Sequence, residues 1–365
     1  MNAGHDAHNA RVHTIREAIQ KHYSSGNTKK LRFSHGSTNS TSVLRSEHND
    51  VSVDISGLNK ILEIDNEKIV VEPNVPMDVL AKETLRHGLI PPVVMEFPGI
   101  TVGGGIQGAA LESSSWRWGQ FNDIALEYEM ITGSGNTIQA SPDENKDLFY
   151  GTSGSYGSLG LLTRATLKLI PARPYVRVSY RRTGNEHDAL AALEEACDSN
   201  DNDFVESIVF DKDTSVLILG RFSAEADPPV QTFSSASDQW FWRHARAIGE
   251  RFSFYEETVP TMDYLFRYDR GAFWMGEYGF SKFSIPHNML TRTLLNPIMS
   301  TRKLYEALHA SRASQSYFIQ DVYVPWESAP ACLEYNKNSL HLYPIWLCPI
   351  KATKLSQKLD RKSVV

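Results

Sequence analysis

Residues 97–108 read FPGITVGGGIQG, and ESSSWRWG follows at residues 112–119. Glycine has no Cβ, so the backbone of such a segment can approach a bound ligand closely. Consecutive backbone N–H groups form concave anion sites, to which nearby hydroxyl groups add further donors. A diphosphate offers many acceptor oxygens for charge-assisted hydrogen bonds. The segment therefore predicts a loop that binds a pyrophosphate group.

The glycines have three alternative interpretations. A dinucleotide fingerprint requires a strand, G-x-G-x-x-G and a helix in succession, and PPVVMEFP at 91–98 makes a poor strand. The lysine of a Walker-type phosphate loop is missing. A tight glycine turn between core elements stays open. A second small polar run, SHGSTNST at 34–41, and the serine-rich run at 112–119 favour the ligand.

Composition limits the classes of function. The chain has 365 residues with a formal net charge of -6, and no Lys/Arg cluster stands out, which argues against nucleic-acid binding. Three scattered cysteines are too few for a disulfide framework or a zinc site, so we expect no metal. The polar, His-rich N-terminus has no apolar segment, so we expect a soluble or peripherally membrane-attached protein inside the cell, without a signal peptide or membrane anchor.

Hydrophobic periodicity predicts an α+β protein with two domains, residues 1–172 and 173–365, separated near Pro171 and Pro174. In the first domain we expect helices at 11–23 and 77–87, strands at 29–33, 51–55 and 163–170, and hairpins at 61–72 and 124–140. In the second we expect a strand at 176–182, a helix at 186–197 and a strand pair at 204–210 and 215–222.

A third segment, DLFYGTSGSYGSLGLLT at 147–163, resembles a motif of the vanillyl-alcohol-oxidase-type flavoproteins, whose fold is called PCMH-type. The resemblance covers residues 29–171 in order. It implies a two-subdomain FAD-binding domain followed by an α+β cap or substrate domain. In that family the first polar loop and the TVGG segment hold the pyrophosphate.

The same resemblance implies which residues bind FAD. They are Ser37, Thr38, Asn39, Ser40, Thr101, Val102, Gly103, Gly104, Ser113, Ser114, Gly119, Gly160 and Leu161. Some relatives attach FAD covalently through a histidine that follows two glycines. Here His35-Gly36 aligns with that pair and Ser37 falls in the attachment position. We therefore expect non-covalent FAD.

Several strings are similar to the delta(24)-sterol reductase branch of this fold: TVGG with ESSS, SPDENKDLFY at 141–150, IPARPYV at 170–176, RKLYE at 302–306, QDVYVP at 320–325 and YPIWLCP at 343–349. This resemblance implies NADPH-dependent reduction of the C24 side-chain double bond of a sterol-like molecule, with peripheral contact to the endoplasmic reticulum membrane. The branch usually starts with a membrane helix and continues past YPIWLCP. Here a charged tail at 354–365 follows instead, so we expect a chain truncated at its C-terminus, with its oligomeric state open.

Reduction of an isolated alkene by hydride requires an acid that protonates the other alkene carbon. Residues of acidic type lie in or near the matching strings, and each of them can equally be structural: Glu112, Glu277, Tyr278, Asp321 and Tyr323. The aromatic runs at 240–242 and 273–274 fit a sterol pocket or plain core. Two other functions stay open, an FAD-linked oxidase or dehydrogenase of an alcohol or biosynthetic intermediate and a truncated flavin-binding protein without turnover.

Overall fold

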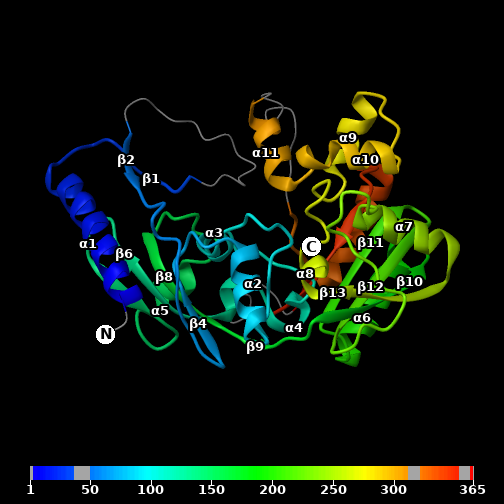
Figure 1. Cartoon of the computed structure of the whole chain (residues 1–365), viewed down its shortest axis with the longest axis horizontal. Helices are drawn as coiled ribbons and strands as arrows, with labels where there is room; N and C mark the ends of the chain where they lie inside the picture. Colours follow the sequence, from blue (N-terminus) through cyan, green and yellow to red (C-terminus); the bar gives the residue numbers. More distant parts are fainter. Residues whose placement is uncertain (1–2, 37–49, 311–320, 353–361, 365) are drawn as a thin grey trace. The chain divides into compact units, whose positions relative to one another are not determined.

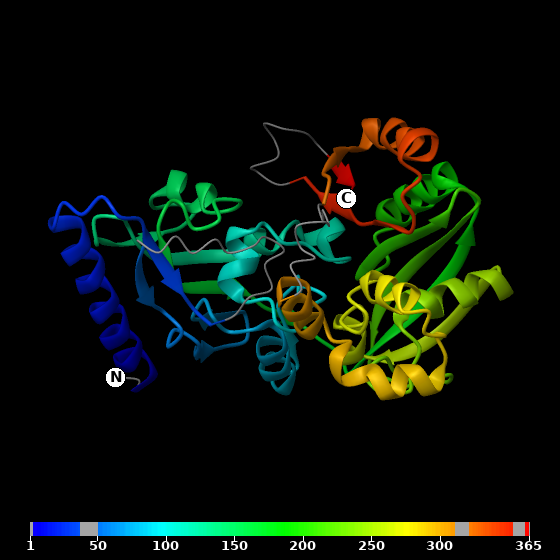
Figure 2. The ribbon, with the colours of Figure 1, turned by 90° about the horizontal axis from the view of Figure 1, so that it is seen from above.

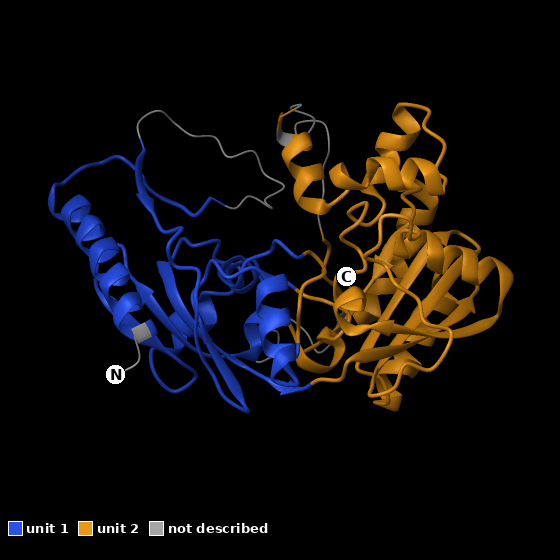
Figure 3. Ribbon diagram, viewed as in Figure 1, with its two compact units in different colours: residues 1–92, 98–110, 121–171 blue, residues 93–97, 111–120, 172–365 orange. Residues whose placement is uncertain are grey.

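The computed structural model describes residues 3–36, 50–310, 321–352 and 362–364. They form two compact units, shown in blue and orange in Figure 3. Unit 1 contains residues 1–92, 98–110 and 121–171, and unit 2 contains residues 93–97, 111–120 and 172–365. Two short segments of the first 172 residues thus pack with unit 2. The α+β class is confirmed, and the domain limits of 1–172 and 173–365 stay a prediction.

Unit 1 is built on an antiparallel five-stranded sheet of order β3-β4-β8-β6-β7. Two smaller sheets accompany it, the parallel pair β1-β2 and the antiparallel pair β5-β9. Its elements are α1 (Ala3–Ser24), β1 (Leu31–Ser34), β2 (Val51–Asp54), β3 (Ile61–Ile64), β4 (Lys68–Val71), α2 (Met77–Arg86), β5 (Leu89–Ile90), α3 (Val102–Gln107), η1 (Phe121–Ile124), β6 (Ala125–Ile131), β7 (Thr137–Ala140), α5 (Lys146–Gly151), β8 (Leu161–Lys168) and β9 (Ile170–Pro171).

Both hairpins predicted for unit 1 are confirmed, β3-β4 and β6-β7. Alternation explains the sheet: β8 shows a mostly alternating burial pattern, and its residues Ala165 and Leu167 are fully buried. Strand β8 starts at Leu161, two residues before the predicted start at residue 163, because Ile131 of β6 pairs with Leu161.

Helix α1 starts at Ala3, earlier than the predicted start at residue 11. Val12, Ile15 and Ile19 pack into a cluster of buried residues beside the sheet, as the spacing predicts (Figure 1). The additional turns are held by His8, a fully buried side chain. Its Nδ1 lies 2.8 Å from Glu72 Oε1 and its Nε2 lies 3.0 Å from Glu129 Oε1. This tertiary contact explains why a polar segment continues the helix.

The glycine-rich segment is helical, which corrects the expectation of a loop. Thr101 caps helix α3, because its Oγ1 accepts a hydrogen bond from Gly104 N at 3.2 Å. Glycine is a poor helix former, but packing requires it here. A Cβ added at Gly103 would lie 2.7 Å from Pro73 Cβ. Gly103 therefore lets α3 lie directly against the segment at Pro73.

Unit 2 is built on a second antiparallel sheet of order β13-β10-β12-β11-β15, with a smaller sheet of order β14-β17-β16. Its elements are α4 (Ser115–Trp118), β10 (Tyr175–Thr183), α6 (Glu186–Ser199), β11 (Phe204–Asp211), β12 (Thr214–Ser223), α7 (Phe241–Arg251), β13 (Phe254–Pro260), α8 (Thr261–Leu265), α9 (Met275–Lys282), α10 (Met289–Leu295), η2 (Asn296–Ile298), α11 (Thr301–Ala310), β14 (Val324–Pro325), η4 (Trp326–Ser328), α12 (Ala329–Tyr335), η5 (Asn336–Leu340), β15 (Ile345–Leu347), β16 (Pro349–Lys351) and β17 (Lys362–Val364).

Helices cover this sheet on both faces, as the turned view in Figure 2 also shows. Leu217 of β12 packs with α6, whereas its neighbour Val216 lies against Gly249 of α7. Successive strand residues point to opposite faces, so α6 and α7 lie on opposite sides. The predicted helix at 186–197 and strand pair at 204–222 are confirmed by α6, β11 and β12. Within the described residues, no helix has the length and apolar character needed to cross a bilayer.

Candidate functional site

The structure distributes the predicted FAD residues over both units. Unit 1 carries Thr101, Val102, Gly103, Gly104, Gly160 and Leu161, and unit 2 carries Ser113, Ser114 and Gly119. The four residues of the first loop, Ser37, Thr38, Asn39 and Ser40, lie outside the described residues. The parts of the predicted site are therefore described unit by unit.

The backbone amides at the start of α3 already have acceptors within unit 1. Val102 N donates to Val75 O at 2.9 Å, and Gly103 N donates to Pro73 O at 2.8 Å. Gly104 N donates to the capping hydroxyl of Thr101. Gly104 is nevertheless exposed, and because glycine has no Cβ, no side chain covers its backbone. A ligand can therefore approach α3 at Gly104, although these three amides are not free to bind it.

Gly160 lies directly before β8, and its backbone packs closely against the last residue of β6, Ile131. A Cβ at this position would lie 2.8 Å from Ile131 O, so only glycine allows the approach. The preceding turn also contacts α3, because Tyr156 N donates to Gln107 O at 3.2 Å. The motif at 147–163 thus supports the helix that carries the TVGG residues. Direct contact of Gly160 and Leu161 with FAD stays a prediction.

The serine run of unit 2 is buried. Ser113 O accepts a hydrogen bond from Val205 N at 2.8 Å, and Ser115 Oγ accepts one from Glu112 N at 3.0 Å. Within the described residues, Ser114 Oγ has no hydrogen-bond partner although it is buried. An unsatisfied buried hydroxyl is costly unless a ligand or water pairs with it. This orphan donor fits a polar cofactor such as FAD.

Glu112 belongs to a buried ion-pair cluster in unit 2. Arg267 Nη2 donates to Glu112 Oε1 at 2.8 Å and to Glu206 Oε1 at 2.9 Å. Ser113 donates to the other oxygen of Glu112 through both its amide and its hydroxyl. Burial alone would lower the pKa of Arg267, but the two carboxylates raise it well above its usual value. Arg267 is thus a permanent cation shared by two carboxyl groups.

The second carboxylate of this cluster is fixed by aromatic donors. Glu206 Oε2 accepts hydrogen bonds from Tyr268 Oη at 3.0 Å and from Trp346 Nε1 at 2.6 Å. Trp346 stands in β15, within the YPIWLCP string. That string therefore helps to position the charged cluster. Arg267, Glu206 and Tyr268 lie in none of the strings quoted from the sequence, and no local pattern marked them.

The other predicted acids are spread over unit 2. Glu277 of α9 accepts a hydrogen bond from Arg243 Nε at 2.9 Å, and its neighbour Tyr278 is 56% exposed. Tyr323 is 45% exposed and its hydroxyl accepts a hydrogen bond from Gln120 at 3.2 Å. Burial raises the pKa of Asp321. A catalytic role for Glu112 or any of these four residues stays a prediction.

Sequence reasoning missed Glu96, which belongs to unit 2. Burial, together with the nearby charges of Glu112 and Asp321, raises the pKa of Glu96 to about 8. A carboxyl group with this pKa is largely protonated at neutral pH. The residue sits in PPVVMEFP, next to the glycine-rich segment, but a lone glutamate there carries no signal by itself.

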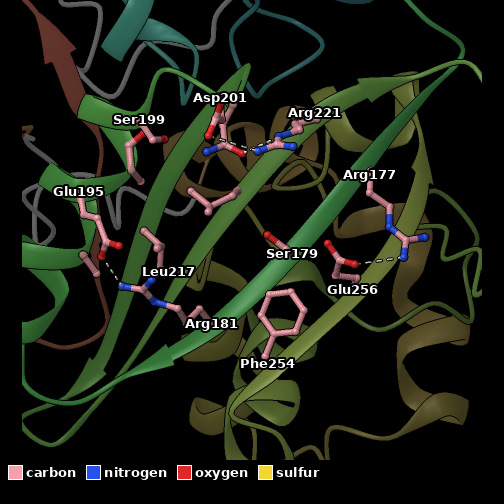
Figure 4. Close-up of a pocket in the computed structure, with 14 residues that line it drawn as sticks. Arg177, Ser179, Arg181, Glu195, Ser199, Asp201, Leu217, Arg221, Phe254 and Glu256 are labelled. Carbon is pink, nitrogen blue, oxygen red and sulfur yellow. Dashed lines mark hydrogen bonds and ion pairs between the residues drawn. The ribbon is translucent and has the colours of Figure 1, made fainter.

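A cavity of about 360 Å³ lies on the face of the unit 2 sheet beside α6 (Figure 4). Each arginine at its rim has an acidic neighbour: Arg181 Nη2 lies 3.0 Å from Glu195 Oε2, and Arg177 Nη2 lies 3.2 Å from Glu256 Oε2. None of the predicted site residues lines this cavity. We assign it no part in FAD binding.

Comparison with known families identifies part of the N-terminal region of the chain. The family described as FAD binding domain matches residues 15–141. This match covers β1, β2, the glycine-rich segment and the β6-β7 hairpin. It confirms that the segments at 34–41, 97–108 and 112–119 belong to an FAD-binding domain, whereas the segment at 147–163 lies outside the match.

Relatives cover most of the chain. The Delta(24)-sterol reductase of Pisum sativum is 32% identical over 84% of this chain and 57% of its own length. The Homo sapiens enzyme is 31% identical over 79% of this chain and 57% of its own length. A Delta(24)-sterol reductase homolog of Caenorhabditis elegans is 27% identical over 96% of this chain and 70% of its own length.

The chain thus spans 57% of the length of the pea and human relatives. The similarity is not confined to the flavin domain, because it extends beyond residues 15–141 into unit 2. The chain is therefore a homologue of the delta(24)-sterol reductases that carries a PCMH-type FAD binding domain.

Proposed function

We propose that the protein is an FAD-dependent reductase of the C24 side-chain double bond of a sterol-like molecule, with NADPH as the electron donor. One observation carries this proposal: the identity to delta(24)-sterol reductases extends over 79–84% of the chain, through both units. An FAD-binding domain alone would permit many reactions. The shared second unit favours the reductase.

In this reaction the residues of the chain bind the cofactor and align the substrate. When bound, FAD supplies the hydride chemistry. The exposed Gly104 and the unpaired hydroxyl of Ser114 are two separate candidates for cofactor contacts. The protein must also align the alkene, exclude water and place an acid beside the second alkene carbon. Aromatic side chains such as Phe273 and Trp346 offer an apolar surface for this purpose.

Anaerobic flavin spectroscopy tests the proposal. We expect NADPH to bleach the absorbance of bound FAD, and desmosterol, a sterol with a C24 double bond, to restore it. Cholesterol, which lacks that double bond, is the matched control and should leave the flavin reduced. Bleaching by an alcohol with peroxide release would favour the oxidase instead. Tight FAD binding without reduction by either donor would favour a binding protein without turnover.

A sterol dissolves in membranes rather than in water, so the substrate must be taken from a bilayer. We infer that the protein contacts an intracellular membrane peripherally, in the cytoplasm or at the endoplasmic reticulum. Flotation with sterol-containing vesicles measures this contact. Recovery of all the protein in the vesicle-free fractions would contradict it.

A further inference from the structure

Helix α10 of unit 2 presents its apolar side chains to solvent. None of its residues is buried, and Met289, Leu290 and Leu294 are 66%, 67% and 69% exposed. Leu290 and Leu294 are four residues apart, so they lie on the same face of the helix. A helix at the surface of a globular protein normally turns such a face toward the core. Within the described residues, the apolar face of α10 is therefore left uncovered.

Polar contacts hold α10 in place instead of apolar packing. Arg292 Nη2 donates a hydrogen bond to Ser237 O at 2.9 Å, which ties the helix to the preceding part of unit 2. At the N-terminus, Asn288 Oδ1 accepts a hydrogen bond from Thr291 N, and Thr291 Oγ1 accepts one from Asn288 N, both at 3.1 Å. This reciprocal pair is a capping box. The fold thus fixes the helix and leaves its leucines free to contact something else.

Further large apolar side chains, each more than half exposed, occur directly before and after α10 in the chain. They belong to α9, to the connection between the two helices and to η2. Figure 1 labels α9 and α10 next to each other in unit 2. We call the whole set the α9–α10 surface: Tyr278, Phe283, Met289, Leu290, Leu294 and Ile298. Single exposed apolar residues are ordinary on soluble proteins, but a group of them marks an interaction surface.

The segment that contains this surface is basic, although the chain as a whole is acidic. Residues 275–303 include four basic residues and one acidic residue, whereas the formal net charge of the chain is -6. The acidic residue, Glu277, already accepts a hydrogen bond from Arg243 Nε at 2.9 Å. Lys282 is exposed and lies one helical turn after Tyr278, so both share a face of α9. A cation thus lies beside the apolar side chains.

This combination of apolar and basic groups fits an anionic lipid bilayer. Helices that lie in the interface of a membrane have an apolar face with lysine or arginine beside it. The apolar side chains enter the acyl region, and the cations are attracted to anionic headgroups. A second copy of this chain would fit less well, because a symmetric dimer would bring the two basic segments together, and like charges oppose such contact.

We propose that the α9–α10 surface binds anionic phospholipid bilayers, with Leu290 and Leu294 inserted among the acyl chains and Lys282 at the headgroups. The proposal assigns the peripheral membrane contact to a defined part of unit 2. It rests on the proposed function, because a sterol is obtained from a bilayer. Binding to lipid nevertheless requires no flavin reduction and no turnover, so the surface can be tested apart from the reaction.

Flotation of the FAD-loaded protein with vesicles of phosphatidylcholine and phosphatidylserine tests the apolar part of the surface. We expect Leu290→Ser combined with Leu294→Ser to weaken partitioning at least about 10-fold, a loss that the exposure of two leucines to water readily accounts for. Leu340→Ser combined with Leu342→Ser is the matched control, because these leucines of unit 2 are 50% and 62% exposed and lie outside the surface. Both double variants should keep the wild-type midpoint of urea unfolding.

Lys282→Glu tests the contribution of charge. On vesicles that contain phosphatidylserine, we expect binding at low salt to weaken at least about 5-fold, since each cation near an anionic surface contributes about 1 kcal/mol. High salt should remove most of this difference by screening. Vesicles of phosphatidylcholine alone should bind the wild type and Lys282→Glu equally. Lys82→Glu, at an exposed lysine of α2, is the control for the change in net charge and should float as wild type does.

The outcomes separate bilayer binding from the proposed reaction. Equal flotation of the wild type and the Leu290→Ser, Leu294→Ser double variant would overturn the proposed lipid surface, as would a wild type that does not float. Light scattering that shows wild-type dimers and monomers of the double variant would also overturn it, because a second copy would then cover the surface. Desmosterol in detergent requires no bilayer. Normal flotation without reoxidation by desmosterol in detergent would therefore overturn the reductase alone.

Discussion

Arg267 and Glu112 are joined by a 2.8 Å hydrogen bond, and both side chains are buried in unit 2. The two residues are far apart in the sequence. Arg267 also donates a hydrogen bond to Ser113, the first serine of the run that follows Glu112. Arg267 also holds Glu206 of β11. The pair therefore links the segment at 111–120 to the sheet of the unit to which it belongs.

Replacement of Arg267 by methionine should destabilise the protein strongly. Glu112 and Glu206 would remain buried without their cation, and loss of one partner of a buried ion pair costs about 3–5 kcal/mol. Urea unfolding measures the change. Arg181→Met is the control, because its pair with Glu195 is solvent-exposed and such pairs contribute about 0–1 kcal/mol. Equal losses in the two variants would contradict the assigned role of Arg267.

His8 should give unit 1 a pH-dependent stability. Burial alone would lower the pKa of His8, but Glu129 and Glu72 raise it above 6.5. The stabilisation is therefore fully present below pH 6.5 and is lost as the pH rises through the higher value of the folded protein. We expect His8→Gln to lower the free energy of unfolding by about 2 kcal/mol at pH 6 and by less at pH 9. Hydrogen bonds to charged groups contribute about 1.5–3 kcal/mol to stability.

The measurement for His8 is urea unfolding between pH 6 and pH 9. His13→Gln changes an exposed histidine of the same helix and should show little effect at any pH. The charged neighbours Arg11 and Arg164 stay in place in both variants. A loss for His8→Gln that is the same at pH 6 and pH 9 would exclude a contribution from its ionisation.

Alanine substitutions at the neighbouring Gly103 and Gly104 should have different effects on stability and on FAD binding. A Cβ at Gly103 would overlap Pro73, and overpacking costs about 1–3 kcal/mol. At Gly104 the nearest atom is the side-chain atom Thr101 Oγ1 at 3.1 Å, which has to move only slightly, so alanine should be tolerated for stability. If FAD approaches Gly104, however, Gly104→Ala should weaken FAD binding. Unfolding and flavin-fluorescence titration of both variants distinguish packing from ligand contact.

Ser114→Ala should separate cofactor binding from stability in a different way. The hydroxyl of Ser114 has no partner within the described residues, so the FAD-free protein should keep its stability when the group is removed. Loss of one hydrogen bond to FAD would raise the Kd about 2- to 13-fold, corresponding to about 0.5–1.5 kcal/mol. Ser158→Ala, at an exposed serine, is the control. An unchanged Kd would remove Ser114 from the FAD site.

FAD should be released by acid precipitation of the loaded protein. The alignment of His35-Gly36 places Ser37 where a histidine would carry a covalent bond to the flavin. Absorbance of the supernatant and pellet after trichloroacetic acid treatment measures the release. A yellow pellet would contradict non-covalent binding.

Much of the fold was predictable, because it follows from local rules. The β3-β4 and β6-β7 hairpins and helix α2 arise from alternation, turn residues and a terminal glycine. The start of α1 was missed because His8 is polar, and only its contacts with Glu72 and Glu129, distant in sequence, explain its burial. Helix α3 was missed because glycine opposes helices locally, whereas packing against Pro73 requires it.

The candidate site was predictable only where residues form motifs. The resemblance marked Thr101 and Ser114, which lie in quoted strings, but it could not mark Arg267, which pairs with Glu112 through the tertiary fold. Glu96 was missed for a similar reason. Its raised pKa is caused first by burial and then by the charges of Glu112 and Asp321, and no spacing along the chain brings these groups together.

The discontinuous path of the chain has a consequence for biosynthesis. Residues 111–120 belong to unit 2, and their Trp116 is part of a core with Ala189, Leu193 and Leu333. These residues emerge from the ribosome before the partners that bury them have been made. Trp116 therefore stays without its complete core until Leu333 has been synthesised. Unit 2 therefore cannot fold from the later part of the chain alone, as a separate C-terminal domain often does. A C-terminal fragment that starts at Ala172 would lack both Trp116 and Glu112, so it would not contain the complete interior of unit 2.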